Sequence, residues 1–192
     1  ETGFHTPGHL VGSENNTRRC RINSHIFCRT IGLHELQRYT SGHKIKNNIK
    51  LLDIGTGGGF PALPIAITYP EIQVTAVDSI AKKINAIENM KLELGLSNLH
   101  PICARVENLD NKKFELVVSR AVASLDKLIK YAEKCVQKDG YFVAFKSKLL
   151  DDELENAKQV LKRSCLKLID TIEYELPTEE KHIRKLVVFK CS

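Results

Sequence analysis

Short apolar segments alternate with amphipathic segments through most of the chain after residue 49. The apolar segments have the length of buried strands and cover residues 50–54, 72–77, 99–104, 114–118 and 141–145. Segments of helical character lie between and after them, at 61–68, 81–94, 125–135 and 151–163. This alternation of strand and helix predicts an α/β fold built on a doubly wound, mostly parallel sheet.

Individual segments support this assignment. In 81–94 the apolar residues Ile84, Ile87 and Leu94 follow a helical period, and Gly95 provides the expected stop. After the last helix come two further strand patterns, 166–173 and 185–190, separated only by a loop that contains Pro177. A short connection favours antiparallel pairing, so we expect an antiparallel C-terminal edge on the sheet.

The first part of the chain lacks this pattern. We therefore divide the chain into 1–44, a partial or degenerate N-terminal segment, and a folded domain at 45–192. Residues 1–20 are rich in Gly, Thr, Asn and His and are typical of disordered or foreign sequence, while 33–39 has the pattern of a short helix. The chain begins with Glu rather than Met, as a fragment or processed chain does.

Composition excludes several classes of protein. A length of 192 residues with 42% hydrophobic and 27% charged residues suits one globular domain, and no apolar run is long enough to span a membrane. The net charge of +6 suits a polyanionic partner and equally an ordinary surface, so charge alone does not decide. The six cysteines lack metal-ligand spacing, from which we expect no metal site and a reducing cytoplasm.

Polar residues end each of the five expected parallel strands. Ligands of doubly wound sheets bind at the carboxyl ends of the strands, where the strand order reverses. The residues that the pattern brings to this edge are Asp53 with the glycine loop 55–59, Asp78, Arg105–Glu107, Arg120 and Lys146.

The glycine loop has the form acidic-x-G-x-G-x-G, with Gly55, Gly57 and Gly59. It differs from the dinucleotide fingerprint, because Phe60 stands where the third glycine belongs, and no Lys-Ser/Thr follows as in a P-loop. Such a loop lets the backbone approach a ligand closely. Asp53 either holds a cationic amino group of the ligand or orients the loop.

Asp78 suggests which ligand this is. A carboxylate at the end of the second strand can accept both hydroxyls of a ribose. Combined with a loop that lacks phosphate-binding features, it points to an adenosyl compound without phosphates, S-adenosylmethionine. The alternative is that Asp78 only caps the following helix. Glu107 either reaches the adenine edge or is a solvated loop carboxylate.

Several motifs resemble those of a known family, the bacterial small-subunit (16S) ribosomal RNA guanine-N7 methyltransferases, also called glucose-inhibited division protein B. The most distinctive stretch is Ser-Arg-Ala-Val-Ala-Ser-Leu at 119–125. The loop 53–61 and the segments 105–107, 145–147 and 184–188 also resemble the family. The resemblance covers about residues 45–190.

The resemblance implies a seven-stranded class I methyltransferase fold with S-adenosylmethionine as cofactor. It also implies that five residues contact the cofactor or line its pocket: Gly55, Phe60, Val106, Glu107 and Arg120. The implied activity is methyl transfer to N7 of a guanine in 16S ribosomal RNA. The implied partner is that RNA or the small ribosomal subunit. We expect a monomer, because no apolar heptad or exposed apolar stripe argues against one.

Arg120 and Lys146 are the residues that we expect to hold the RNA during catalysis. Guanine N7 carries a free lone pair and no proton, so its methylation needs alignment rather than a general base. The alternatives are an ion pair of Arg120 with Asp53 or Glu107, and a solvated strand end for Lys146. A small-molecule methyltransferase and a catalytically impaired S-adenosylmethionine- or RNA-binding remnant remain alternative functions.

Overall fold

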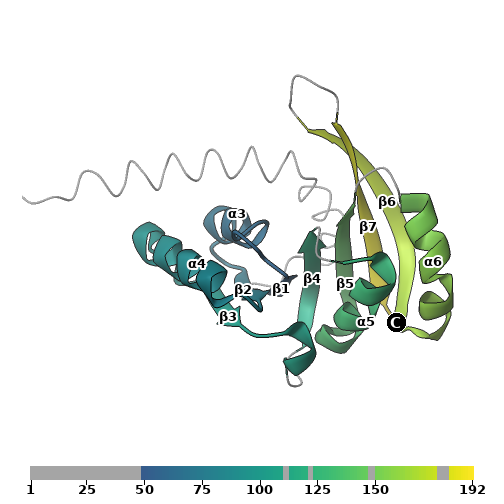
Figure 1. Ribbon diagram of the computed structural model, residues 1–192, viewed down its shortest axis with the longest axis horizontal. Coiled ribbons are helices and arrows are strands. Elements are labelled where there is room, and N and C mark those ends of the chain that lie inside the picture. Colours follow the sequence, from purple (N-terminus) through teal and green to yellow (C-terminus); the bar gives the residue numbers. More distant parts are fainter. Residues whose placement is uncertain (1–48, 110–112, 121–122, 147–149, 177–181) are drawn as a thin grey trace, which may run out of the picture.

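The central element of the protein is a seven-stranded sheet with helices on both faces (Figure 1). The computed structural model describes residues 49–109, 113–120, 123–146, 150–176 and 182–192. The strands are β1 (Lys50–Ile54), β2 (Gln73–Asp78), β3 (Leu99–Cys103), β4 (Phe114–Arg120), β5 (Val136–Lys146), β6 (Leu166–Leu176) and β7 (His182–Cys191). The helices are α3 (Ala62–Thr68), α4 (Ala81–Leu94), α5 (Leu125–Cys135) and α6 (Leu150–Arg163), with a 3₁₀ turn η1 (Val106–Asn108).

The strand order is β3-β2-β1-β4-β5-β7-β6. β1 pairs in parallel with both β2 and β4, so the order reverses between β1 and β4. β7 lies between β5 and β6 and is antiparallel to both. This arrangement confirms the predicted doubly wound sheet with its antiparallel C-terminal edge.

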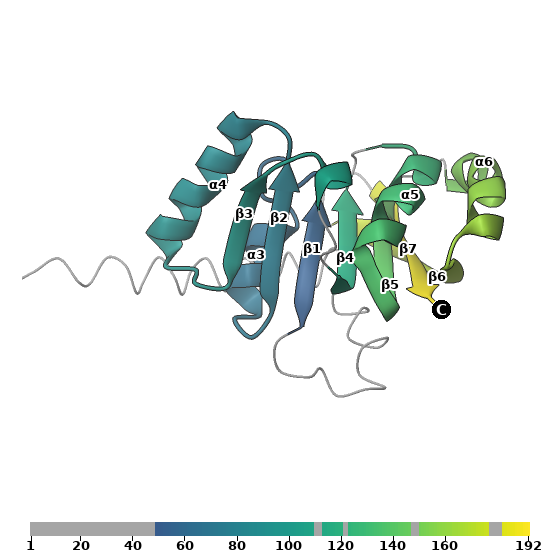
Figure 2. The same ribbon diagram turned by 90° about the horizontal axis from the view of Figure 1, so that it is seen from below.

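Two apolar cores lie on opposite faces of the sheet. One contains the buried side chains of α3 and α4, including Ile65 and Ile87. The other contains those of α5 and α6, including Ile129 and Ala157 (Figure 2). The alternation of side chains along each strand supplies both cores: Leu51 of β1 belongs to the first and Leu52 to the second.

Several boundaries differ from the sequence-based expectation. The strand predicted at 141–145 begins earlier, at Val136, and so includes 138–140, where Asp139 has φ of 61° and the pairing with β4 shifts register. Strands β6 and β7 extend beyond the predicted 166–173 and 185–190, because the hairpin ladder continues toward its loop. The turn η1 was not predicted. The division at residue 44 and the helix expected at 33–39 lie outside the described residues.

Within the described residues, no helix has both the length and the apolar character needed to cross a membrane. The same residues contain no group of three or more His, Cys, Asp or Glu side chains arranged to hold a metal ion.

Candidate functional site

A pocket of about 610 Å³ opens at the carboxyl ends of the parallel strands. This volume lies in the range of small-molecule binding sites. It lies where the strand order reverses between β1 and β4, as expected for an open α/β sheet. The lining residues are Ile54–Gly58, Phe60, Val77–Ile80, Lys83, Ala104–Glu107, Arg120 and Tyr131.

The glycine loop forms one wall of the pocket. Gly55 and Gly57 line it, and both have positive φ angles, 68° and 60°. Gly59 has φ of 90° but lies outside the lining. A Cβ atom on Gly59 would lie 2.3 Å from Cδ1 of Leu63, so this glycine lets the loop pack against α3. The three glycines therefore have two different structural roles.

Asp53 lies beneath the loop and outside the pocket lining. It is 0% exposed, and its Oδ2 accepts a hydrogen bond of 3.2 Å from the backbone N–H of Ala62. This bond joins the end of β1 to the start of α3, so Asp53 orients the loop from behind. Burial raises the pKa of Asp53 to about 7, although the Thr56 hydroxyl, the Ala62 amide and the charge of Arg120 each lower it.

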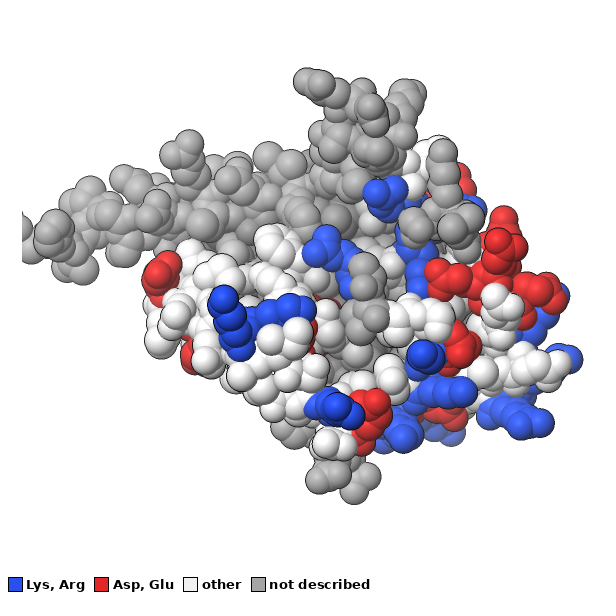
Figure 3. All heavy atoms as spheres, viewed as in Figure 1, with Lys and Arg blue, Asp and Glu red and all other residues white. Residues whose placement is uncertain are grey.

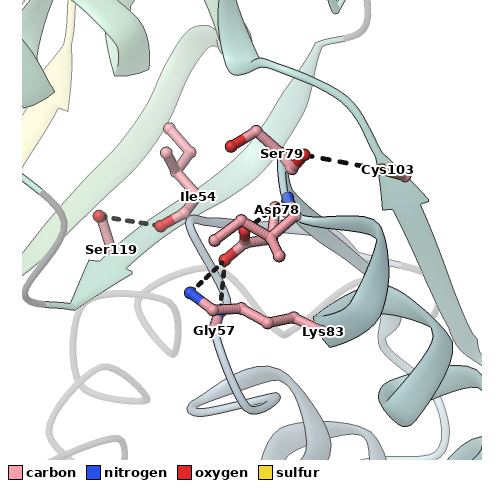
Figure 4. Close-up of polar contacts among 8 residues, drawn as sticks. Ile54, Gly57, Asp78, Ser79, Lys83, Cys103 and Ser119 are labelled. Carbon is pink, nitrogen blue, oxygen red and sulfur yellow. Dashed lines mark hydrogen bonds and ion pairs between the residues drawn. The ribbon is translucent and has the colours of Figure 1, made fainter.

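Asp78 lines the pocket at the end of β2 (Figure 4). Its Oδ2 accepts a hydrogen bond of 3.0 Å from the N–H of Gly57, and its Oδ1 accepts one of 3.0 Å from the N–H of Ile80. The side chain thus supports the glycine loop and the entry to α4 together. Lys83 Nζ lies 3.5 Å from Oδ2 and is largely exposed. A carboxylate has about four acceptor positions and these contacts use three, so Asp78 keeps capacity for a ligand hydroxyl.

A second wall follows β3. Arg105, Val106 and Glu107 all line the pocket, and Tyr131 of α5 lies beside them. The carboxylate of Glu107 raises the pKa of the Tyr131 phenol. Glu107 is exposed as well as lining, so its side chain is available to a ligand at this rim.

Arg120 and Phe60 form the third wall. The guanidinium carbon of Arg120 lies 5.7 Å from the centre of the Phe60 ring, a cation–π arrangement. Among the described residues, neither Asp53 nor Glu107 forms an ion pair with Arg120. Directly before it, the Ser119 hydroxyl donates a hydrogen bond of 3.0 Å to the carbonyl of Ile54. That buried bond fixes the end of β4 against β1 under the pocket.

Lys146 is not at the pocket. It is buried, and its Nζ donates to the carbonyl of Ala123 at 3.0 Å and to Glu153 Oε2 at 2.6 Å. The same Oε2 accepts the backbone N–H of Leu125 at 2.9 Å. Lys146 therefore joins the end of β5 to α6 and to the start of α5. Its buried position contradicts the alternative of a solvated strand end, and its expected role in holding RNA stays a prediction.

The structure brings together Gly55, Gly57, Phe60, Asp78, Val106, Glu107 and Arg120 of the predicted site residues. Sequence reasoning did not select Tyr131 or Lys83, which both line the pocket. Tyr131 lies in the middle of a helix, where periodicity gives no signal of a pocket. Lys83 carried a usable signal, because the first turn of a helix after a strand-end carboxylate lies close to that carboxylate.

Comparison with known proteins shows to which family this chain is related. The rRNA small subunit methyltransferase G family, GidB, matches residues 30–183. The chain belongs to this family. A relative of the same name from Lactobacillus helveticus (strain DPC 4571) is 39% identical over 159 residues, covering 79% of this chain and 65% of the relative. The relative of the same name from Aster yellows witches'-broom phytoplasma (strain AYWB) is 37% identical over 137 residues, which cover 69% of this chain and 65% of the relative.

This chain thus spans 63–65% of the length of the relatives from Lactobacillus and Thermoanaerobacter. Solved structures of low sequence identity share the fold of this chain. Fibrillarin from Aeropyrum pernix, solved with bound S-adenosyl-L-methionine, gives a TM-score of 0.59 at 13% identity, covering 74% of this chain and 67% of that one. TrmN from Thermus thermophilus gives 0.61 at 17% identity, covering 83% and 48%.

Proposed function

We propose that this chain transfers a methyl group from S-adenosylmethionine to N7 of a guanine in 16S ribosomal RNA. The observation that carries the proposal is one pocket, at the reversal point of the sheet, lined by the glycine loop, Asp78, Glu107 and Arg120 in a member of the rRNA small subunit methyltransferase G family. The proposed partner is that RNA, alone or in the small ribosomal subunit.

The pocket residues fit the proposed cofactor chemically. Asp78 offers carboxylate oxygens to ribose hydroxyls, and the loop from Gly55 to Gly58 brings backbone close to the ligand. Val106 and Ile80 offer apolar surface to a purine ring, and Glu107 offers an acceptor to its amino group. Arg120 offers a cation to a carboxylate. These groups lack the cluster of phosphate-binding features that a dinucleotide requires.

When bound, S-adenosylmethionine supplies an electrophilic methyl group attached to a sulfonium. Guanine N7 presents a lone pair without a proton, so this chain needs to supply no general base. Its contribution is to hold the two reactants in line and to exclude water between them. Arg120, exposed at the pocket rim and stacked on Phe60, is placed to contact guanine O6 or a phosphate and leave N7 free.

Surface charge contributes less to this proposal than the pocket does. On the face in Figure 3, Lys and Arg side chains occur in separate groups, and acidic side chains gather over α6, whose first turn carries Asp151, Asp152 and Glu153. We propose that the protein acts as a monomer, because its sequence contains no apolar heptad pattern that would indicate self-association. We also propose that it acts in the cytoplasm, where its RNA substrate is assembled.

The test is methyl transfer by the whole chain to small subunits, and to naked 16S RNA, from cells that lack this modification. We expect label from S-adenosylmethionine to appear at guanine N7, mapped by chain cleavage specific for N7-methylguanine. Unlabelled RNA together with cofactor binding in calorimetry would support an impaired, cofactor-binding protein instead. Absence of cofactor binding would overturn the proposal entirely.

A further inference from the structure

Two thiols lie close together where β6 begins and β7 ends. In the strand order, β7 and β6 are at the opposite end of the sheet from β3 and β2, whose ends form part of the pocket. Cys165 directly precedes β6, and Cys191 is the last residue of β7. Their Sγ atoms are 2.6 Å apart. We propose that Cys165 and Cys191 form a redox-modification site, at which a low-molecular-weight disulfide oxidises the pair to an intramolecular disulfide.

The backbone already holds the two cysteines in position for this bond. Leu166, the neighbour of Cys165, pairs with Cys191 in the β6–β7 ladder. The backbone N–H and the hydroxyl of Ser192 both donate to the carbonyl of Cys165, at 3.1 and 3.3 Å. A disulfide has an S–S distance of about 2.05 Å, so the two sulfur atoms, 2.6 Å apart, lie close to bonding distance.

Access to the two sulfur atoms differs. Cys165 is half-buried, whereas Cys191 is 6% exposed. Cys165 is therefore the one that an external reagent reaches first, and Cys191 is the resolving thiol. Among the described cysteines, Cys165 and Cys191 are the two whose sulfur atoms are in contact. Cys103 is exposed, with its Sγ near the carbonyl of Ser79, and Cys135 is buried.

The reaction balances with a disulfide RSSR as oxidant. The Cys165 thiolate attacks one sulfur of RSSR and forms a mixed disulfide with it, while the S–S bond of RSSR breaks. The RS⁻ that is released takes up the proton that Cys165 lost. The Cys191 thiolate then attacks Cys165 Sγ, which releases the second RS⁻ to take up the Cys191 proton. Two protein thiols and RSSR become one protein disulfide and two RSH.

The rate should depend strongly on pH. Burial, together with the hydrogen bond and charge of Cys191, raises the pKa of the Cys165 thiol to about 12. Because the thiolate is the nucleophile, oxidation is slow at neutral pH and speeds up about tenfold per pH unit below that pKa.

The test incubates the reduced whole chain with oxidised glutathione at mildly alkaline pH, followed by alkylation and peptide mass analysis. We expect the Cys165 and Cys191 peptides to be joined, with the loss of two hydrogens, and Cys103 to carry glutathione instead. The joined peptides should persist in Cys103→Ser, the control variant. They should be absent from Cys191→Ser, in which Cys165 retains glutathione.

Stability provides a second measurement. A disulfide here closes a loop between residues 26 positions apart, so oxidation should raise the melting temperature of the wild-type chain by several degrees, reversibly with dithiothreitol. Cys191→Ser should show no such rise. Free alkylation of Cys165 after oxidation, or its joining to a different cysteine, would overturn the proposal. Neither result depends on methyl transfer, because the pair lies outside the pocket lining.

Discussion

Asp78 and Lys146 end two strands of the same sheet, yet one lies in the pocket and the other is enclosed by protein. After β2 the chain enters α4 through a bond from the Ile80 amide to Asp78, which leaves the carboxylate facing the pocket. After β5 the first turn of α6 supplies Glu153, which binds the ammonium of Lys146 directly. Both residues are the last of their strands, so this position alone does not explain the difference.

The difference shows that the segment after a strand decides whether its last side chain reaches a ligand. The first turn of α6 offers Lys146 a half-buried carboxylate at 2.6 Å, whereas the first turn of α4 offers Asp78 only the exposed ammonium of Lys83 at 3.5 Å. The polar groups of the β2 end therefore remain available for binding, and those of the β5 end hold the fold together. The following predictions test this distinction.

Replacing Lys146 with Met should have the largest effect on stability and little effect on the pocket. Glu153 would lose its cation while half-buried, so the free energy of unfolding should fall by about 2–3 kcal/mol in urea titration. Lys158→Met, which removes the exposed pair with Glu155 on the same helix, should cost less than about 0.5 kcal/mol. Unchanged stability with lost methyl transfer would instead make Lys146 catalytic.

Asp78→Asn should weaken cofactor binding about 10- to 100-fold in calorimetry, because the ribose hydroxyls would lose a charged acceptor. The free energy of unfolding should change much less than in Lys146→Met. Asp151→Asn removes an exposed carboxylate on α6 and should leave the affinity unchanged. An unaltered affinity in Asp78→Asn would mean that Asp78 serves only to hold Gly57 and Ile80.

Asp53 should make stability depend on pH. Its pKa rises from 3.8 to about 7 on folding, so the native state holds a proton that the unfolded chain releases. This stabilisation is complete below pH 3.8 and is lost as pH rises to about 7, at roughly 1.4 kcal/mol per pH unit. Urea titrations of Asp53→Asn should lack that decline, and Asp151→Asn should retain it. Equal slopes in wild type and Asp53→Asn would contradict the assignment.

The smallest effect is expected from Lys83→Met. Its ammonium is largely exposed and 3.5 Å from Asp78, so the ion pair contributes at most about 1 kcal/mol. Cofactor affinity should change by less than about fivefold, and the change should shrink further with added salt. A larger loss than in Asp78→Asn would show that Lys83 itself binds the ligand.

The sequence predicted the fold well because its determinants are local. Periodicity identified α4 and α5, and alternating apolar segments identified the parallel strands. The glycine loop and Asp78 were also predictable, since each precedes a helix and follows a strand. For Asp53 the sequence left two alternatives, and its bond to the Ala62 amide matches the one in which it orients the loop. The surroundings of Lys146 and Tyr131 were not predictable, because they come from α6 and from the β3 end, which the sequence does not place relative to them.

The position of β7 has a consequence for synthesis of the chain. β7 is made after β6 but separates it from β5, so neither strand can complete its ladder until residues 182–191 exist. During translation β5 presents an open edge to other chains for the whole time that α6 and β6 are being added. The sheet therefore closes only after β7 has been made, and truncation within β7 would leave the edges of both β5 and β6 unpaired.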